Sequence, residues 1–417
     1  ETGALADYTV RLAAGQLRSP HGVTGSDIKH HRGNKAVRGR RVMGSTEAGA
    51  GEASPPSGVV SFPDPLGRCL RYEKLSDIAG GSFGFVQRCV DKVTGEEVAA
   101  KFILRKVLST NAKLLTTVER EVVNHSRLVH PFIISFKDFF LLEKYLVIIQ
   151  ELGDQGDLAD YIMKYRALPE EQARRLFQQY LIALDYMHRN GIVNRDIKPE
   201  NTLVKTDVAG NLSVRICDFG NSKDQERQSQ AKTRVGSPQY MAPEVVISPA
   251  SYDGKMADMW SCGVMLYVML MARNPFLRPG ETVNHSQMFA RMQSGAFMLK
   301  DSLSPAAKDL IRSLLQPQVE DRLSLAQALA HPWVTQDMSP ELLAMNDHHP
   351  READPCLPPP HEVLNIITSG VVDPPLDPNR EKPSSFPGNM TGGLSVTDVR
   401  PSVSRRTAQS KACCVVC

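Results

Sequence analysis

The sequence predicts an α+β protein with two lobes, a small β-rich lobe followed by a larger helical lobe. From Tyr72 to residue 150 the apolar residues recur mainly at the period of strands, and from Pro169 to Trp333 they recur at helical periods. The composition, 41% hydrophobic and 23% charged over 417 residues, is that of a globular protein large enough for more than one core-bearing unit.

The small lobe, residues 72–150, is expected to contain five strands and one helix. A helical pattern covers 111–128. In one strand, alternation places Val98 and Ala100 on one face and Ala99 and Lys101 on the other. The strand-like runs lie at 75–81, 85–90, 97–104, 136–142 and 144–150.

The larger lobe, residues 154–334, is expected to be mainly helical. Residues 170–190 and 255–271 have the length and apolar period of helices, whereas 201–204 and 214–217 are short strand-like pieces. A cleft between two such lobes is a usual place for a ligand.

The segments that flank this domain have a different composition. Residues 1–71 are rich in Gly and Ser, with eight Lys or Arg against three acids over 1–45, and are predicted to form a basic disordered arm. Residues 335–417 carry 12 of the 28 prolines and are predicted to be mostly a tail. Within this tail, the apolar pattern of residues 361–370 predicts either a helix that docks on the domain or a transient helix in a disordered segment. Its apolar face consists of Val363, Leu364, Ile366 and Ile367.

Charge and hydropathy exclude several classes of protein. The net charge of +3 is too small to indicate a nucleic-acid partner, and the longest apolar run, 262–272, is too short to span a membrane. The scattered cysteines favour a reducing, intracellular compartment, either cytoplasmic or nuclear. Separately, a monomer is expected. Because the sequence begins at Glu1 and not at Met, an N-terminal targeting signal could precede it.

Four short patterns carry candidate chemistry. The glycine-rich turn at 79–86 would let backbone N–H groups approach phosphate oxygens, although a plain hairpin turn is the alternative. The second pattern is VAAK, 98–101, whose Lys101 could be a further partner in this site or a surface lysine on an edge strand. Asp218, at a strand end and followed by Phe-Gly, could hold a divalent metal or begin an ordinary turn. Asp196, Lys198 and Asn201, in NRDIKPENTLV, could equally form a polar turn.

Taken in order, these patterns resemble the eukaryotic protein kinases across 72–334. The matching set is the glycine turn, VAAK, a helix with a glutamate, RDIKPEN, DFG, APE and DMWSCG. The segments EREVVNHSRLVHPFI, PENTLV, ICDFGNSK and YDGKMADMWSCGVMLYVML are similar to the plant and green-algal osmotic-stress kinases, the second subfamily of the sucrose-nonfermenting-related kinases. The resemblance implies the bilobal protein kinase fold, with ATP and Mg²⁺ as cofactors.

The resemblance also implies roles for these residues. Asp196 would orient and deprotonate an incoming hydroxyl, and Lys198 would stabilise phosphoryl oxygens. Asn201 and Asp218 would hold magnesium. Lys101 would grip the α- and β-phosphates, fixed by a helix glutamate for which the family's spacing favours Glu121 over Glu119. Glu119 would then be a solvated helix residue. The ATP-binding set would be Ala79, Gly80, Gly81, Ser82, Phe83, Gly84, Val86, Ala99, Lys101, Glu151, Gly153 and Asp157, with Gln150 at the gatekeeper position.

The expected activity is transfer of the ATP γ-phosphate to protein serine or threonine hydroxyls in stress signalling, since tyrosine kinases usually lack the lysine at 198. Ala79 stands where the first loop glycine is usual, and Asn194 where histidine is usual. These departures motivate the alternative of a weakly active or inactive nucleotide-binding scaffold. A purely structural interaction protein is a third alternative. Ser237 replaces the common threonine and keeps its hydroxyl.

Regulation and partners are also expected from the resemblance. Thr233 aligns with the position that relatives phosphorylate, by an upstream kinase or by autophosphorylation, and otherwise is a loop hydroxyl. Asp157 and Glu200 would favour Arg or Lys about three residues before the acceptor. The terminus KACCVVC fits a lipidation signal on Cys414, with a plain soluble tail as the alternative. Peripheral membrane association is expected only with that lipid.

Overall fold

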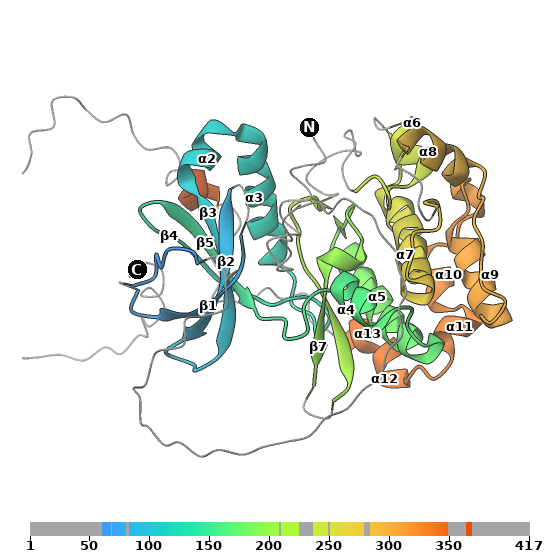
Figure 1. Cartoon of the computed structure of the whole chain (residues 1–417), viewed down its shortest axis with the longest axis horizontal. Coiled ribbons are helices and arrows are strands. Elements are labelled where there is room, and N and C mark those ends of the chain that lie inside the picture. Colours follow the sequence, from blue (N-terminus) through green and yellow to red (C-terminus); the bar gives the residue numbers. More distant parts are fainter. Residues whose placement is uncertain are drawn as a thin grey trace, which may run out of the picture.

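The structure, a computed structural model, describes residues 61–67, 69–80, 83–207, 210–224, 237–248, 251–278, 284–348 and 364–368. Figure 1 shows a small lobe, built on one sheet, beside a larger lobe of helices. The α+β, two-lobed architecture expected from the sequence is confirmed.

Five antiparallel strands form the sheet of the small lobe in the order β1-β2-β3-β5-β4. The five expected strands are confirmed, with ends that differ by a few residues. They are β1 (Tyr72–Gly80), β2 (Gly84–Asp91), β3 (Glu97–Leu104), β4 (Phe136–Leu141) and β5 (Tyr145–Glu151).

Two helices, α2 (Arg105–Thr110) and α3 (Ala112–His125), cover one face of this sheet (Figure 1). The side chain of Asn111 caps α3 by accepting from the Leu114 N–H, which satisfies a donor at the helix start. Only one helix was expected here, because six residues are too few for α2 to show an apolar period.

The other face of the sheet carries a second apolar cluster, which residues before β1 complete. Leu66 and Cys69 are buried there against Phe85, Phe102 and other side chains of β2 and β3. The sequence assigned these leading residues to the basic arm. In the structure they cover apolar side chains of the sheet, and burying such surface stabilises the lobe.

The large lobe is built around two long buried helices, α5 (Glu170–Arg189) and α7 (Gly254–Met271). Asp253 caps α7 by accepting from the Lys255 and Met256 N–H groups. Both expected long helices are confirmed. The remaining helices are α4 (Leu158–Tyr165), α6 (Pro243–Ile247), α8 (His285–Gln293), α9 (Pro305–Leu314), α10 (Leu325–Leu329), α11 (Pro332–Thr335), α12 (Pro340–Leu343) and α13 (Met345–His348), with 3-10 turns η1 (Pro199–Asn201) and η2 (Val319–Asp321).

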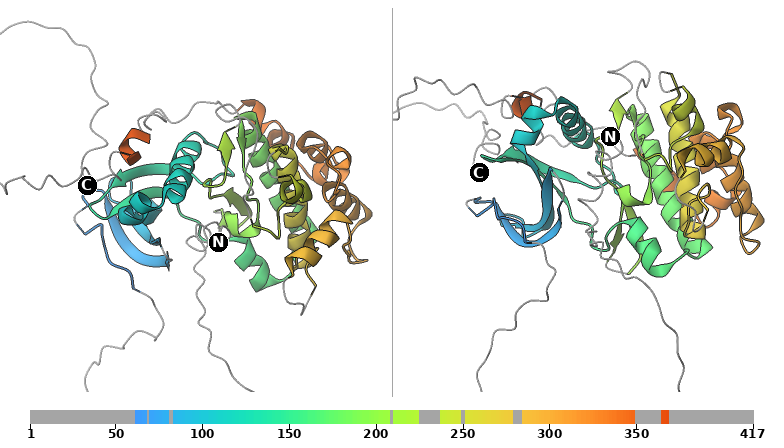
Figure 2. Two further views of the ribbon diagram at one scale, coloured as in Figure 1. Left: turned by 90° about the horizontal axis from the view of Figure 1, so that it is seen from above. Right: turned by 45° about the horizontal axis from the view of Figure 1, so that its top comes forward.

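Two small ribbons lie where the large lobe meets the small one (Figures 1 and 2). One pairs β7 (Thr202–Thr206) with β8 (Leu212–Ile216), and the other pairs β6 (Ile192–Val193) with β9 (Lys223–Asp224). The loops at their ends carry NRDIKPEN and DFG. Hairpin pairing therefore brings two sequence motifs together that lie some twenty residues apart in the chain.

Two parts of the region after the domain are folded. Asn346 donates from Nδ2 to Asp185 Oδ2 on α5 at 2.8 Å, which ties α13 to the large lobe. Residues 364–368 form a short helix, called the tail helix below, that lies beside α2 (Figure 2). Its Ile367 is fully buried among Val118, Val122 and other residues of the small lobe. Within the described part of the chain, no helix is both long and apolar enough to cross a membrane.

Candidate active site

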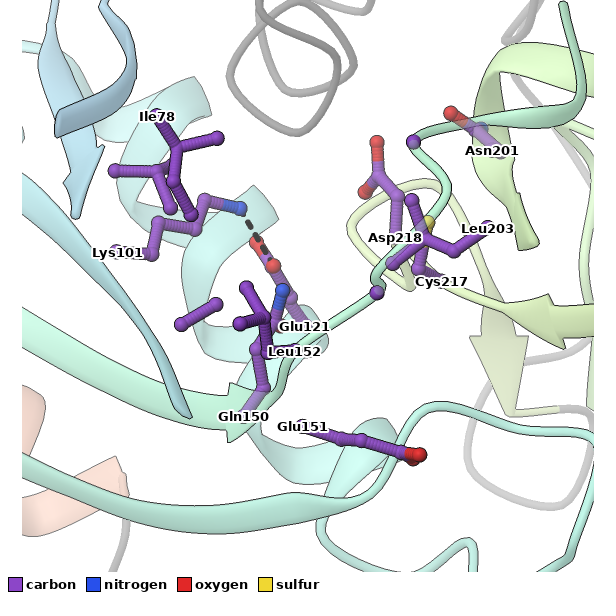
Figure 3. Close-up of a pocket in the computed structure, with 14 residues that line it drawn as sticks. Ile78, Lys101, Glu121, Gln150, Glu151, Leu152, Asn201, Leu203, Cys217 and Asp218 are labelled. Atoms are coloured by element: carbon purple, nitrogen blue, oxygen red, sulfur yellow. Dashed lines mark hydrogen bonds and ion pairs between the residues drawn. The ribbon is translucent and has the colours of Figure 1, made fainter. Parts of the chain in front are cut away.

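An ion pair joins the sheet to α3. Lys101 Nζ lies 2.6 Å from Glu121 Oε1, and both side chains are buried. Figure 3 shows the two side chains pointing at one another on one side of a pocket. A buried pair of this kind is costly to break, because the remaining charge is left without a partner. The sequence favoured Glu121 over Glu119, and the structure pairs Glu121 with Lys101.

Glu119 is turned toward the tail helix instead. It is half-buried and hydrogen-bonded to Thr368, and burial raises the pKa of its carboxyl although the Thr368 hydrogen bond opposes this. The expectation that Glu119 is a solvated helix residue is therefore wrong. It rested on one helix in isolation, whereas the contact comes from a segment more than two hundred residues later.

The pocket between the lobes has apolar walls and polar groups at one end (Figure 3). Lys101, Glu121, Asn201 and Asp218 supply the polar end. This arrangement suits a ligand with an apolar part and a charged part. The other lining residues are Ile78, Val86, Ala99, Gln150, Glu151, Leu152, Gly153, Gly156, Leu203 and Cys217.

The connection between the lobes holds its polar side chain away from the pocket. The Glu151 carboxylate accepts from Lys205 Nζ at 2.6 Å, so Glu151 presents backbone to the pocket. A Cβ added at Gly153 would come within 3.0 Å of Leu203 Cδ1. The absence of a side chain at Gly153 therefore keeps this wall open.

Asp196 is buried and held by donors on both carboxylate oxygens. Oδ1 accepts from the Ser237 N–H at 3.1 Å and from Ser237 Oγ at 3.3 Å. Oδ2 accepts from Asn201 Nδ2 at 3.0 Å and lies 3.1 Å from Lys198 Nζ. Lys198 also donates to Ser237 Oγ at 2.7 Å. The hydroxyl that Ser237 retains thus joins the acid and the lysine of this loop, and a positioned carboxylate can take up a proton.

Besides Glu121 Oε2, two buried oxygens of pocket-lining residues accept no hydrogen bond from any described residue. They are Asn201 Oδ1 and Asp218 Oδ2. Burial, and then the charge of Glu121, raises the pKa of Asp218. Buried polar atoms normally find partners, and amide and carboxylate oxygens are ligands that Mg²⁺ prefers. This pair of oxygens fits a bound divalent cation.

Asp218 lies in the left-handed region of backbone conformation, with φ of 65°, which is uncommon for residues other than glycine. The following residue, Phe219, is fully buried, and its ring centroid lies 4.8 Å from that of His125 on α3. Asn124 Nδ2 donates to Ser222 Oγ at 2.9 Å. The loop that carries Asp218 is thereby tied to α3 from two sides.

Asn194 is a turn residue in this site. Its Oδ1 accepts from the Asp196 N–H at 3.0 Å, around Arg195 with φ of 64°. Its own N–H, like that of Arg195, donates to Asp258 at 2.9 and 2.8 Å. An asparagine can stabilise such a turn through its side chain. The replacement of the usual histidine did not reveal this contact, which the spacing of Asn two residues before Asp could have indicated.

The other expected nucleotide-binding residues surround the pocket without lining it. Ala79, Gly80, Phe83 and Gly84 lie at the β1–β2 turn, where a Cβ at Gly84 would come within 1.8 Å of Phe102 O. Asp157 caps α4, accepting from the Asp160 N–H at 2.7 Å, and burial raises its pKa to about 7. Gly81, Ser82, Thr233 and Cys414 lie outside the described residues.

Several lining residues were not found from the sequence. Ile78, Leu152, Gly156, Leu203 and Cys217 belong to the pocket wall. Alternation from Asn201 along β7 could have indicated Leu203, since residues two apart share a face. A bulge between Asp77 and Ala79 breaks the alternation at Ile78.

Comparison with known proteins decides the family. Residues 72–334 match the model of the protein kinase domain. The chain belongs to the protein kinase family. It is 35% identical to serine/threonine-protein kinase SRK2E of Arabidopsis thaliana over 79% of this chain and 88% of the relative.

Two further plant kinases are similar over a comparable length. They are SAPK9 of Oryza sativa subsp. japonica, 34% identical over 72% of this chain and 82% of the relative, and SRK2A of Physcomitrium patens, 36% identical over 72% and 85%. The resemblance of this kinase to the plant osmotic-stress kinases, expected from its sequence, is confirmed.

Proposed function

We propose that this kinase transfers the γ-phosphate of Mg-ATP to serine and threonine hydroxyls of other proteins. The observation that carries the proposal is the convergence of Asp196, Lys198, Asn201 and Asp218 opposite the Lys101–Glu121 pair, with each of these six side chains buried or lining the pocket. The names of the similar plant kinases support serine or threonine as acceptor. Stress signalling is proposed from the same likeness.

In this proposal Asp196 orients the acceptor hydroxyl and takes its proton. The hydroxyl oxygen forms a bond to the γ-phosphorus of ATP, while the bond between that phosphorus and the ADP oxygen breaks. Lys198 lies 3.1 Å from Asp196 Oδ2 and would neutralise charge on the transferred group. Lys101 would hold the phosphates of the bound nucleotide. The remaining site, including the β1–β2 turn, Glu151, Gly153 and Asp157, would position ATP.

Asn201 would hold magnesium through Oδ1 and Asp218 through Oδ2, and neither oxygen accepts a hydrogen bond from a described residue. The ion would supply positive charge next to the phosphate oxygens. Asn201 also donates to Asp196 Oδ2 at 3.0 Å, so the same side chain orients the carboxylate.

Regulation by phosphorylation of Thr233 is part of the proposal. Burial lowers the pKa of Arg120 on α3, and the positive charge of Arg195 lowers it further. Two neighbouring guanidinium groups form a site that a phosphate would fit. A phosphate bridging them would tie α3 to the loop that carries Asp196.

A nucleotide-binding scaffold without useful turnover is the second candidate, favoured by Ala79 and Asn194. Against it, Asn194 forms hydrogen bonds that support the Asp196 loop. A peptide library of Ser, Thr and Tyr acceptors, incubated with the purified kinase and Mg-ATP, tests the proposal. Phosphorylated Ser and Thr peptides, enriched in Arg or Lys about three residues before the acceptor, are expected. ATP binding with no phosphorylated peptide would support the scaffold instead.

A further inference from the structure

We propose that Phe62, which precedes the kinase domain in sequence, is a positioning residue for the glycine-rich turn between β1 and β2 and so raises the affinity for nucleotide. This inference rests on the proposed function, because it takes the turn to cover the phosphates of ATP. Phe62 lies ten residues before the start of the matched kinase domain.

The ring of Phe62 occupies the space that a side chain at residue 80 would need. A Cβ added at Gly80 would lie 2.0 Å from Phe62 Cζ and 2.4 Å from Cε1. Gly80 pairs with Phe85 across β1 and β2, and directly paired residues face the same side of a sheet. The Phe62 ring stacks on Phe85, with centroids 5.1 Å apart and an interplanar angle of 3°. Phe62 therefore packs against the last residue of β1, where the glycine-rich turn begins.

A hydrogen-bond network fixes the backbone at Phe62. Its N–H donates to Asp77 Oδ2 at 3.1 Å, and its carbonyl accepts from Lys74 Nζ at 3.0 Å. The fully buried Gln87 donates from Nε2 to Asp77 Oδ1 at 2.9 Å and to Pro63 O at 2.8 Å. Buried side-chain amides with two partners are costly to displace. The segment before the domain is thus held by side chains of both β1 and β2.

The opposite face of the same two strands lines the nucleotide pocket. Ile78 of β1 and Val86 of β2 belong to the pocket wall, while Phe85 and Gly80 face Phe62. Glycine-containing turns have many accessible backbone conformations, and ordering such a turn on binding lowers affinity. A ring packed against Gly80 reduces that freedom before nucleotide binds. We therefore expect Phe62 to act on ATP binding through the turn, without touching ATP.

A purely structural role would have a different signature. Phe62 belongs to the apolar cluster of Leu66, Phe85, Phe102 and Phe140 on the outer face of the sheet. Phe140 of β4 lies in that cluster and stacks on Tyr72 with centroids 5.8 Å apart, at the opposite end of β1 from Gly80. Phe140→Ala thus truncates the same cluster away from Gly80 and is the matched control for Phe62→Ala.

The test compares the full chain with Phe62→Ala and Phe140→Ala. Backbone hydrogen exchange over 79–86 in nucleotide-free protein and the Kd of a fluorescent ATP analogue with Mg²⁺ are measured, together with KM for ATP and for peptide. We expect both variants to lower Tm. Only Phe62→Ala should speed exchange at the turn and raise Kd and KM for ATP, by about fivefold, which corresponds to about 1 kcal/mol. KM for peptide should stay within about twofold, since Phe62 packs on the outer face of the sheet, opposite the pocket.

A second pair of variants tests the contact itself. Gly80→Ala places a methyl group against the Phe62 ring and should raise the Kd of the ATP analogue. In the Phe62→Ala background the ring is absent, so the same Gly80→Ala change should raise Kd by a smaller factor. The proposal is overturned if Phe62→Ala and Phe140→Ala have equal effects on Kd and on the rate of hydrogen exchange over 79–86. It is also overturned if the effects of Phe62→Ala and Gly80→Ala on the binding free energy are additive. A wild-type protein that binds the analogue but phosphorylates no peptide would refute the proposed function alone, since exchange and Kd would still test Phe62.

Discussion

Lys101 Nζ and Glu121 Oε1 lie 2.6 Å apart, and the pair connects β3 to α3. Two residues before Glu121 on the same helix, Glu119 is hydrogen-bonded to Thr368 of the tail helix. Residues two apart on a helix point about 200° away from each other, so the two glutamates face different neighbours. The segment after the domain therefore contacts the same helix that positions the lysine in the pocket.

The first prediction separates these two glutamates. Glu121→Gln removes the charge that pairs with the buried Lys101, which costs about 3 kcal/mol and should lower kcat/KM at least about 100-fold. Glu119→Gln keeps an acceptor for Thr368 and should retain kcat/KM within about twofold. Steady-state kinetics on one peptide compare them, and similar losses in both variants would contradict a specific role of Glu121.

The second prediction concerns the tail helix. Ile367 is fully buried against the cluster of α3 and β5, so Ile367→Asp would bury a carboxylate and should release the helix, with a loss of several degrees in Tm. Activity should also fall, because α3 loses a packing partner. Asn365→Ser, at an exposed position of the same helix, is the control. Unchanged Tm and activity in Ile367→Asp would show that docking is not needed.

The third prediction is a pH dependence at Asp157. Burial, and then the nearby Asp160 and Glu200, raise its pKa from 3.8 to about 7. Because the folded-state pKa lies above the unfolded one, the ionised carboxylate opposes folding, and stability is lost as pH rises from 4 through 7. Asp157→Asn keeps the helix cap without titrating. Its Tm relative to wild type should rise between pH 5 and pH 8, and a difference that stays constant would contradict the raised pKa.

The fourth prediction addresses the activation segment. Thr233→Ala, purified from the native host, should be at least about tenfold less active than wild type if a phosphate there pairs with the two guanidinium groups. Arg120→Gln should weaken the response to phosphorylation and leave the unphosphorylated rate unchanged, because Arg120 pairs with no reacting group. Full activity in Thr233→Ala would exclude this regulation.

Much of the fold and site followed from the sequence because local patterns determine them. The strand period placed Lys101 and Ala99 on the same face of their strand, and the ordered motifs located Asp196, Asn201 and Asp218. The glutamate choice needed family spacing, since two candidates on one helix are equivalent locally.

Long-range packing was the part that the sequence did not reveal. Phe62 against Gly80, Thr368 against Glu119 and His125 against Phe219 each join segments that no periodicity relates. Phe62 lies in a region whose composition predicts disorder, and this single apolar residue docks because the folded lobe offers a complementary surface, which a composition average does not detect. Thr368 lies in 361–370, where a docking helix was one of two expectations, but its contact with Glu119 was not indicated.

The central claim is that Asp196 serves phosphoryl transfer. The most direct test is the rate of phosphorylation of a serine peptide with an upstream arginine, with Mg-ATP, by wild type and by Asp196→Asn. The account predicts measurable turnover by wild type and a loss of at least about 100-fold in kcat for Asp196→Asn, as for removal of a positioned base, with ATP-analogue affinity retained. Equal rates in the two proteins, or no turnover by wild type that binds ATP, would contradict it.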